Sequence, residues 1–319
     1  MTMDLTNKNE LISYLKQNGL WAKKSLGQNF LVDRGVLDKI VTAADLKLSD
    51  LVLEIGPGVG ALTEELVIKA GRVVAIEKDE KLANLLELRI KNSELSIDAE
   101  IICEDALEFD PESIIKGSLD SSQNLRVARD DKGKGTDLMQ ESLESETLNL
   151  EPVPYKLVAN IPYYITSKIL EKFLTADNKP VLIVLLVQKE VAERVCAKNG
   201  DLSLLGVSVQ YYGDPEIVDI VKRDSFFPVP TVDSAIIKIS NIKYQKSKID
   251  EKNFFKIVKA GFRARRKTLF NNLKAGTNLS SGQTIELLDK MNIGRNARAQ
   301  ELTIEQWVML AREIENSQY

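Results

Sequence analysis

Histidine is absent from this 319-residue sequence, and cysteine occurs only twice. Without an imidazole, Ser-His-Asp and Cys-His catalysis, histidine-ligated metals and histidine acid–base chemistry are all excluded. The two cysteines, Cys103 and Cys196, are too few and too far apart to form a zinc site or a disulfide framework, so we expect buried free thiols. Any reaction must therefore use carboxylates, amides, aromatic rings or a bound cofactor.

Long apolar runs are also missing. The longest, residues 181–187, is far shorter than the roughly 20 residues that cross a bilayer. The first residues, MTMDLTNKNE, have neither the basic start nor the apolar stretch of a secretion signal. The sequence therefore predicts a cytoplasmic protein without a membrane partner, and its content of 44% hydrophobic and 28% charged residues is typical of a globular chain.

A net positive charge is lacking as well, because the formal charge of the chain is −4. The charges are unevenly distributed, however. Residues 246–319 contain 14 basic and 8 acidic side chains, whereas residues 110–151 contain 10 acidic and 5 basic ones. The basic end is compatible with nucleic-acid binding. The stretch 111–154 is polar, acidic and nearly free of aromatic residues, which predicts a surface insertion.

Strand-like and helix-like stretches alternate from residue 51 onward. Alternation of this length predicts a parallel sheet covered by helices on both faces, a doubly wound, Rossmann-like α/β fold. Later strand-like stretches lack long helices between them, which indicates an antiparallel edge. We expect a catalytic domain at residues 1–245 and a small all-α domain at residues 246–319. The expected strands are residues 51–55, 72–77, 99–105, 155–160, 181–187, 202–212, 216–222 and 234–240, and the expected helices are residues 61–70, 81–92, 166–174, 253–273, 281–291 and 303–315.

A glycine loop, residues 56–60 (GPGVG), follows the first expected strand and precedes a helix. Glycines allow the backbone to turn sharply and a ligand to approach without a Cβ in the way. The loop also fits the dinucleotide fingerprint, and a tight turn without a ligand is a further alternative. Glu54 before the glycines and the close glycine spacing favour S-adenosyl-L-methionine, with Gly56 and Gly58 as cofactor-binding residues.

Acidic residues end the next two expected strands. Glu77 closes the second strand, where it would bind ribose hydroxyls in either a dinucleotide site or an S-adenosyl-L-methionine site. Asp105 closes the third, where its carboxylate could accept a hydrogen bond from an adenine amine or, alternatively, cap a helix that begins at Ala106. Both acids lie at the carboxyl edge of the predicted sheet, where doubly wound folds bind their ligands.

The tetrapeptide Asn160-Ile161-Pro162-Tyr163 ends the fourth expected strand. An exocyclic adenine amine is a poor nucleophile, because its lone pair is delocalised into the ring. The Asn160 amide oxygen and a backbone carbonyl can accept its two protons and favour a tetrahedral nitrogen. Pro162 restricts the local backbone, and Tyr163 offers a ring face to an extruded base. A plain strand-to-turn signal is the alternative, but the nearby glycine loop and acids favour methylation of an adenine amine.

Four sequence blocks together resemble the ribosomal RNA adenine N6,N6-dimethyltransferase family. The blocks are residues 23–33 (KKSLGQNFLVD), 54–63 (EIGPGVGALT), 160–166 (NIPYYIT) and 226–237 (FFPVPTVDSAII). The resemblance extends from about residue 20 to about residue 311, and the polar stretch 111–154 interrupts it. It implies S-adenosyl-L-methionine as the cofactor. The residues that it implies at the cofactor are Asn29, Leu31, Gly56, Glu77 and Asp105.

The same resemblance implies how the target base is held. Asn160 would lie between the cofactor and the target amine. Phe226, which begins the Phe-x-Pro-x-Pro block, would sandwich the base against Tyr163. Two alternatives are open for this aromatic: Phe227 could take the role, or Phe226 could be a core residue.

Three branches of the family differ in their action: small-subunit rRNA dimethylation, large-subunit rRNA methylation that gives macrolide resistance, and mitochondrial proteins that sometimes serve in transcription. Residues 261–273 and 293–310 resemble the small-subunit branch. This likeness implies dimethylation of two adjacent adenosines in the 3′-terminal hairpin of 16S rRNA, within a pre-30S subunit, by a monomer. The large-subunit activity and a non-catalytic RNA-binding assembly or transcription factor are the alternatives.

A basic cluster lies in the expected all-α domain. Arg263, Arg265, Arg266 and Lys267 predict a cationic helix suited to RNA phosphates, although a solvated helix face is the alternative. The acidic stretch 111–154 is a departure from the family pattern. It bears on how RNA approaches that side of the protein and leaves the reactive residues unaffected.

Overall fold

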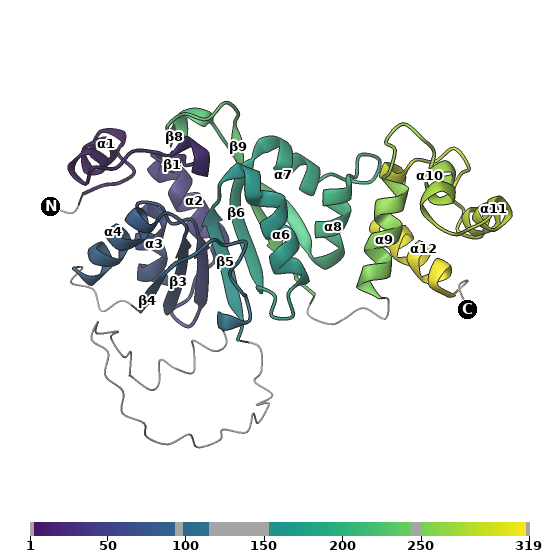
Figure 1. The fold of residues 1–319 in the computed structure, drawn as a ribbon, viewed down its shortest axis with the longest axis horizontal. Helices are drawn as coiled ribbons and strands as arrows, with labels where there is room; N and C mark the ends of the chain where they lie inside the picture. Colours follow the sequence, from purple (N-terminus) through teal and green to yellow (C-terminus); the bar gives the residue numbers. More distant parts are fainter. Residues whose placement is uncertain (1–2, 93–97, 115–152, 244–249, 317–319) are drawn as a thin grey trace, which may run out of the picture.

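The computed structural model describes the chain except for residues 1–2, 93–97, 115–152, 244–249 and 317–319 (Figure 1). Most of the predicted acidic insertion, residues 115–152, lies outside the described residues. Within the described part, no helix is long and apolar enough to cross a membrane.

The core of the molecule is a seven-stranded sheet with the strand order β4-β3-β2-β5-β6-β9-β7. The first five strands in this order are parallel, whereas β9 is antiparallel to both β6 and β7. The predicted parallel sheet with an antiparallel edge is therefore confirmed. The strands are β2 (Leu51–Ile55), β3 (Arg72–Glu77), β4 (Ala99–Cys103), β5 (Tyr155–Asn160), β6 (Leu182–Gln188), β7 (Asp214–Val221) and β9 (Ser234–Ser240).

Helices cover both faces of the sheet, as the doubly wound prediction requires (Figure 1). Alternate strand residues point to opposite faces, so Val52 packs with α2 and α3 while Leu53 packs with α6 and α8. Because both faces are covered, the central strands are mostly apolar, and Glu54 in β2 and Lys156 in β5 are exceptions. The helices are α2 (Arg34–Ala44), α3 (Ala61–Lys69), α4 (Glu80–Lys91), α6 (Thr166–Thr175), α7 (Lys189–Val195) and α8 (Leu204–Tyr212).

One expected strand is a helix. Residues 202–212 were expected to be extended, but Leu204–Tyr212 forms α8. The segment is apolar on most sides because it packs between the sheet and the C-terminal helices, so it shows no clear helical periodicity. The missed signal is Ser203, whose side chain accepts a hydrogen bond from the Gly206 backbone and caps the helix.

The N-terminal segment contains α1 (Lys8–Gln17), the short 3-10 turn η1 (Lys24–Leu26) and the strand β1 (Phe30–Leu31). β1 pairs with β8 (Phe226–Phe227), which follows the turn η3 (Arg223–Ser225). The antiparallel register places Phe30 opposite Phe227 and Leu31 opposite Phe226. This small ribbon joins two sequence blocks that lie almost 200 residues apart.

The C-terminal part is helical, and its core is continuous with the sheet. The ring of Phe254 in α9 stacks on that of Tyr211 in α8 at 4.2 Å between centroids. Reciprocal capping boxes begin the last two helices, at Ser280 with Gln283 and at Thr303 with Gln306. The elements are α9 (Glu251–Gly261), α10 (Leu269–Gly276), α11 (Ser281–Lys290), the turn η4 (Ala299–Glu301) and α12 (Ile304–Asn316).

The predicted cationic helix across residues 253–273 is wrong, because the chain leaves the helix after Gly261 and re-enters one at Leu269. The buried amide of Asn272 explains the break. It donates hydrogen bonds to the carbonyls of Gly261 and Ala264, at 2.7 and 3.1 Å. Residues 262–268, which we call the basic loop, are therefore a turn that connects two helices.

The prediction of buried thiols is wrong for Cys103, which is exposed, whereas Cys196 is partly buried and both are free. Cys103 ends β4, which lies at the edge of the sheet and, among the described strands, pairs with β3 alone. An edge position leaves the end of the strand open to solvent.

Candidate active site

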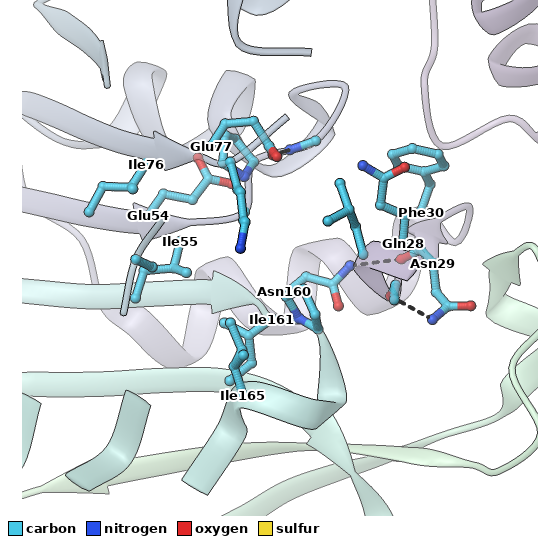
Figure 2. Close-up of a pocket in the computed structure, with 18 of the residues that line it drawn as sticks. Gln28, Asn29, Phe30, Glu54, Ile55, Ile76, Glu77, Asn160, Ile161 and Ile165 are labelled. Atoms are coloured by element: carbon cyan, nitrogen blue, oxygen red, sulfur yellow. Dashed lines mark hydrogen bonds between the residues drawn. The ribbon is translucent and has the colours of Figure 1, made fainter. Parts of the chain in front are cut away.

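A cavity opens at the carboxyl ends of the parallel strands β2, β3 and β5, and the β1 segment closes its opposite side (Figure 2). Residues from the first three of the four sequence blocks line it. We call it the cofactor cavity. From the predicted set, its lining includes Asn29, Leu31, Gly56, Gly58, Glu77, Asp105, Asn160, Pro162 and Tyr163. The strand order explains this gathering, because parallel strands bring their carboxyl ends to one edge.

The glycine loop adopts backbone conformations that side chains disfavour. Gly56, Gly58 and Gly60 have φ values of 68°, 60° and 93°. A Cβ on Gly58 would lie 3.1 Å from the Phe30 ring, and one on Gly60 would lie 2.4 Å from Leu86. The glycines are therefore required both by backbone geometry and by close packing.

Glu77 binds the glycine loop from the end of β3. One of its carboxylate oxygens accepts a hydrogen bond from the Gly58 backbone at 3.0 Å, and the other accepts from the Asp79 backbone at 2.8 Å. Burial raises the pKa of Glu77, although these backbone donors lower it. The side chain thus supports the loop and leaves acceptor lone pairs at the cavity wall.

Asp105 lies at the rim of the same cavity. Its carboxylate accepts a hydrogen bond from the Lys78 ammonium at 2.6 Å and another from the Leu107 backbone at 2.9 Å. The Lys78 hydrogen bond is the main reason why the pKa of Asp105 is lowered. The residue caps a turn at 106–108, so the alternative of a helix N-cap before Ala106 is wrong.

Asn160 ends β5 and faces the β1 segment across the cavity (Figure 2). Its amide nitrogen donates to the Asn29 carbonyl at 3.3 Å, while the Asn29 side chain donates to the Gly27 carbonyl at 3.0 Å. Leu31 is buried beside them at 5% exposure and contributes an apolar wall. The first and third blocks are therefore hydrogen-bonded to each other at the cavity.

Two tyrosines follow Pro162 and differ in exposure. The Tyr163 hydroxyl shares a 2.7 Å hydrogen bond with the Ser234 hydroxyl, and burial raises the pKa of the tyrosine. Tyr164 also lines the cavity but is 61% exposed, and a Cβ on Gly27 would lie 3.2 Å from its ring. Sequence reasoning missed Tyr164, although its place directly after the tetrapeptide was a usable signal.

The structure does not bring Phe226 to the cofactor cavity. Its ring is 1% exposed and packs in the core with α2 and β6 residues. Phe227 is partly buried against Phe30, with the Lys8 ammonium 5.8 Å from its ring centroid. Neither ring lines the cavity.

The basic residues lie far from the cavity, since α9 and α10 occupy the opposite end of the molecule from α3 and α4 (Figure 1). The guanidinium of Arg263 donates to the Ala275 carbonyl at 2.6 Å and thereby closes the basic loop. Arg265, Arg266 and Lys267 are exposed on that loop.

The cavity fits a nucleoside cofactor that carries positive charge. The glycine loop lets backbone approach a ligand closely, Glu77 and Asp105 offer acceptors, and Glu54 at the base of the loop is a buried carboxyl with an unpartnered oxygen within the described residues. A pyrophosphate would instead place negative charge among these acids. The fold and the site together define the class of S-adenosyl-L-methionine-dependent methyltransferases.

Comparison with known proteins narrows this class. The Ribosomal RNA adenine dimethylase family matches residues 19–316. A ribosomal RNA small subunit methyltransferase A from Dehalococcoides mccartyi (strain ATCC BAA-2266) is 42% identical over 292 residues, which cover 91% of this chain and 88% of that protein. The chain therefore belongs to the ribosomal RNA adenine dimethylase family. It is an rRNA methyltransferase, and S-adenosyl-L-methionine is its cofactor.

Solved structures agree with this assignment. A dimethyladenosine transferase from Plasmodium falciparum is similar with a TM-score of 0.69 and 25% identity, covering 90% of this chain and 98% of that one. The 23S rRNA methyltransferase ErmE is similar with a TM-score of 0.64 and 25% identity, covering 90% and 100%. The predicted family, fold class and cofactor are confirmed.

Proposed function

We propose that this chain dimethylates the N6 amines of two adjacent adenosines in the 3′-terminal hairpin of 16S rRNA, within a pre-30S subunit. Support comes from relatives named ribosomal RNA small subunit methyltransferase A, including one from Lactiplantibacillus plantarum that is 36% identical over 97% of this chain. The position of Asn160 at the strand end, facing the cofactor cavity, is the observation that carries the proposed chemistry.

The target amine would be oriented by the tetrapeptide. The Asn160 side-chain oxygen and a backbone carbonyl of the tetrapeptide accept its two protons, which favours a tetrahedral nitrogen directed at the donor methyl. The φ of −56° at Pro162 and the hydrogen bond from the Ile165 backbone to the Pro162 carbonyl hold this turn in one shape. The bound cofactor supplies the electrophilic methyl group.

The base would be held by an aromatic face. Tyr163 is fixed by its hydrogen bond to Ser234, so its ring presents one orientation to the cavity. Phe226 acts as the second face only if β8 shifts on RNA binding, because its ring is 1% exposed in the free protein. Tyr164, which is exposed at the rim, is the better-placed partner for a base in the structure as it stands.

Binding of the RNA is proposed to involve both parts of the chain. We divide the chain into a catalytic domain, residues 1–245, and a helical domain, residues 246–319. The whole chain is proposed to act as a monomer. Arg265, Arg266 and Lys267 are exposed on the basic loop and would contact phosphates, while the hydrogen bond from Arg263 to the Ala275 carbonyl would hold the loop in shape. Because α9 and α10 lie at the opposite end of the molecule from α3 and α4 (Figure 1), an RNA that contacts both this loop and the cavity would extend along the protein.

Asn160→Ala tests the proposed chemistry. With unmethylated small subunits and S-adenosyl-L-methionine, we expect the yield of dimethyladenosine, measured by mass spectrometry of rRNA fragments, to fall about a hundredfold or more. Calorimetry should show that the variant still binds the cofactor, because Glu77 and the glycine loop are intact. Asn199→Ala, at an exposed loop position, is the matched control and should retain wild-type yield. Wild-type yield from Asn160→Ala would refute the proposed role.

Methylation of the large subunit is the second candidate, and the similarity to the 23S rRNA methyltransferase ErmE is the observation that favours it. Parallel incubation of unmethylated small and large subunits separates the two activities. Methyl groups found only in 16S rRNA support the first candidate, whereas methyl groups found only in 23S rRNA support the second.

A further inference from the structure

Glu54 is an ionisable side chain placed where water does not reach it. It is the penultimate residue of β2, is 1% exposed and lines the cofactor cavity. One carboxylate oxygen, Oε2, has no hydrogen-bond partner in the described part of the chain. A buried carboxylate without a partner is unstable when ionised, so such a group is kept neutral or is paired with a cation.

In the part of the chain that the structure describes, no cationic side chain is among the groups that act on the Glu54 carboxyl. Glu77, which ends the adjacent strand β3, is its ionisable neighbour (Figure 2). Thr63 from α3 contributes a hydroxyl. The nearby Lys78 ammonium is engaged by Asp105 at 2.6 Å. Burial raises the pKa of Glu54 to about 8, the Thr63 hydroxyl lowers it, and the charge of Glu77 raises it further. In the empty cavity at neutral pH, Glu54 is therefore mainly a carboxylic acid.

We infer that Glu54 is a proton-linked counter-charge for the cofactor. The empty cavity holds its neutral form, and entry of a cationic ligand expels the proton to solvent and leaves a carboxylate paired with the ligand. One O–H bond breaks, the proton passes to water or buffer, and no electrons are transferred. The inference rests on the assignment of S-adenosyl-L-methionine, which carries both a sulfonium and an α-ammonium group, and either cation could supply the charge.

This assignment makes cofactor affinity depend on pH in a defined direction. Below the pKa of Glu54, each bound cofactor must displace a proton, so binding strengthens as the pH rises. The dissociation constant should fall about tenfold between about pH 6 and about pH 7. At about pH 7, which lies below the pKa of Glu54, most of a proton should be released per cofactor bound, because Glu54 is mainly protonated in the empty site.

Isothermal titration calorimetry in two buffers with different ionisation enthalpies counts the released protons. The ligands are S-adenosyl-L-methionine, S-adenosyl-L-homocysteine, which lacks the sulfonium, and 5′-methylthioadenosine, which lacks both cations. We expect release with the first and none with the third. Release with the second as well identifies the ammonium as the partner, and its absence there identifies the sulfonium.

Glu54→Gln keeps the shape of the side chain and removes the proton. This variant should bind S-adenosyl-L-methionine without proton release and with an affinity that no longer changes with pH. The matched control is Glu64→Gln in α3, because burial also raises the pKa of Glu64, yet that carboxylate pairs with Arg89 and lies outside the cofactor cavity. This control should release as many protons as the wild type.

Binding of S-adenosyl-L-methionine to the wild type without proton release would overturn the inference and leave the cofactor assignment standing. Equal release by the wild type and Glu54→Gln, or equal release with 5′-methylthioadenosine, would also overturn it. No binding of S-adenosyl-L-methionine at all would overturn the cofactor assignment and this inference together. The wild-type proton count is informative even if the variant fails to fold.

Discussion

The cofactor cavity and the basic loop use charge in opposite ways. In the cavity, Glu77 accepts two backbone hydrogen bonds and Asp105 is paired with Lys78, so the charges are held in position before any ligand arrives. On the basic loop, residues 265–267 extend into solvent. A small ligand is recognised by groups whose positions are already set, whereas a polyanion is attracted by accessible charges that need no fixed geometry.

The largest effect should come from the glycine loop of the cofactor cavity, where backbone geometry and close packing leave the least room for a side chain. Gly58→Val combines a left-handed φ of 60° with a Cβ only 3.1 Å from the Phe30 ring, and it disturbs the backbone donor to Glu77. We expect cofactor affinity, measured by calorimetry, to fall more than about a hundredfold. Gly282→Ala in α11 is the control, because an added Cβ there would lie 4.0 Å from the nearest side-chain atom of the described residues, Ser280 Oγ, and the φ of Gly282 is not left-handed. Retained affinity in Gly58→Val would contradict the requirement for glycine there.

An intermediate effect is expected at Asn272, because its amide holds the basic loop in shape. Asn272→Ala leaves the carbonyls of Gly261 and Ala264 without their buried donor, so the free energy of unfolding should fall by about 1–3 kcal/mol. Urea denaturation measures this change, and Asn296→Ala at an exposed position should alter it little. Cofactor affinity of the folded variant should equal that of the wild type. An unchanged unfolding free energy would show that Asn272 does not hold the loop.

The smallest effect should come from the exposed charges of the basic loop, for which the described part of the chain shows no partner that fixes their position. Replacing Arg265, Arg266 and Lys267 together with glutamine should weaken RNA binding about tenfold at moderate salt and lower the salt dependence of binding by up to about three released counterions. Filter binding across a salt series measures both quantities. Cofactor affinity and thermal stability serve as internal controls, and neither should change. An unaltered salt dependence would exclude these residues from the RNA interface.

Most of the sheet was predictable because its strands are strongly apolar and its glycine loop is distinctive. The strands β2, β3, β5 and β6 were expected within one or two residues of their observed bounds. α8 was not, since a helix that is buried on most sides has the same apolar pattern as a buried strand. The break before α10 was also missed, because it depends on a single amide contact rather than on a local signal.

The candidate site was predicted in the same uneven way. Glu77, Asp105 and Asn160 end their strands, so their meeting at one edge follows from parallel order. The hydrogen-bond and packing partners of these residues could not be predicted from the sequence. That Lys78 pairs with Asp105, or that Tyr164 rather than Phe226 is exposed at the cavity, depends on side-chain packing.

The sequence by itself determined the fold class, the family and the strand ends that carry the reactive groups, because periodicity and glycine spacing are local properties of the chain. Only the tertiary structure decided which side chains are buried and which have partners. Burial and pairing set the protonation of a carboxyl such as Glu54, and both arise from contacts between residues that are distant along the chain.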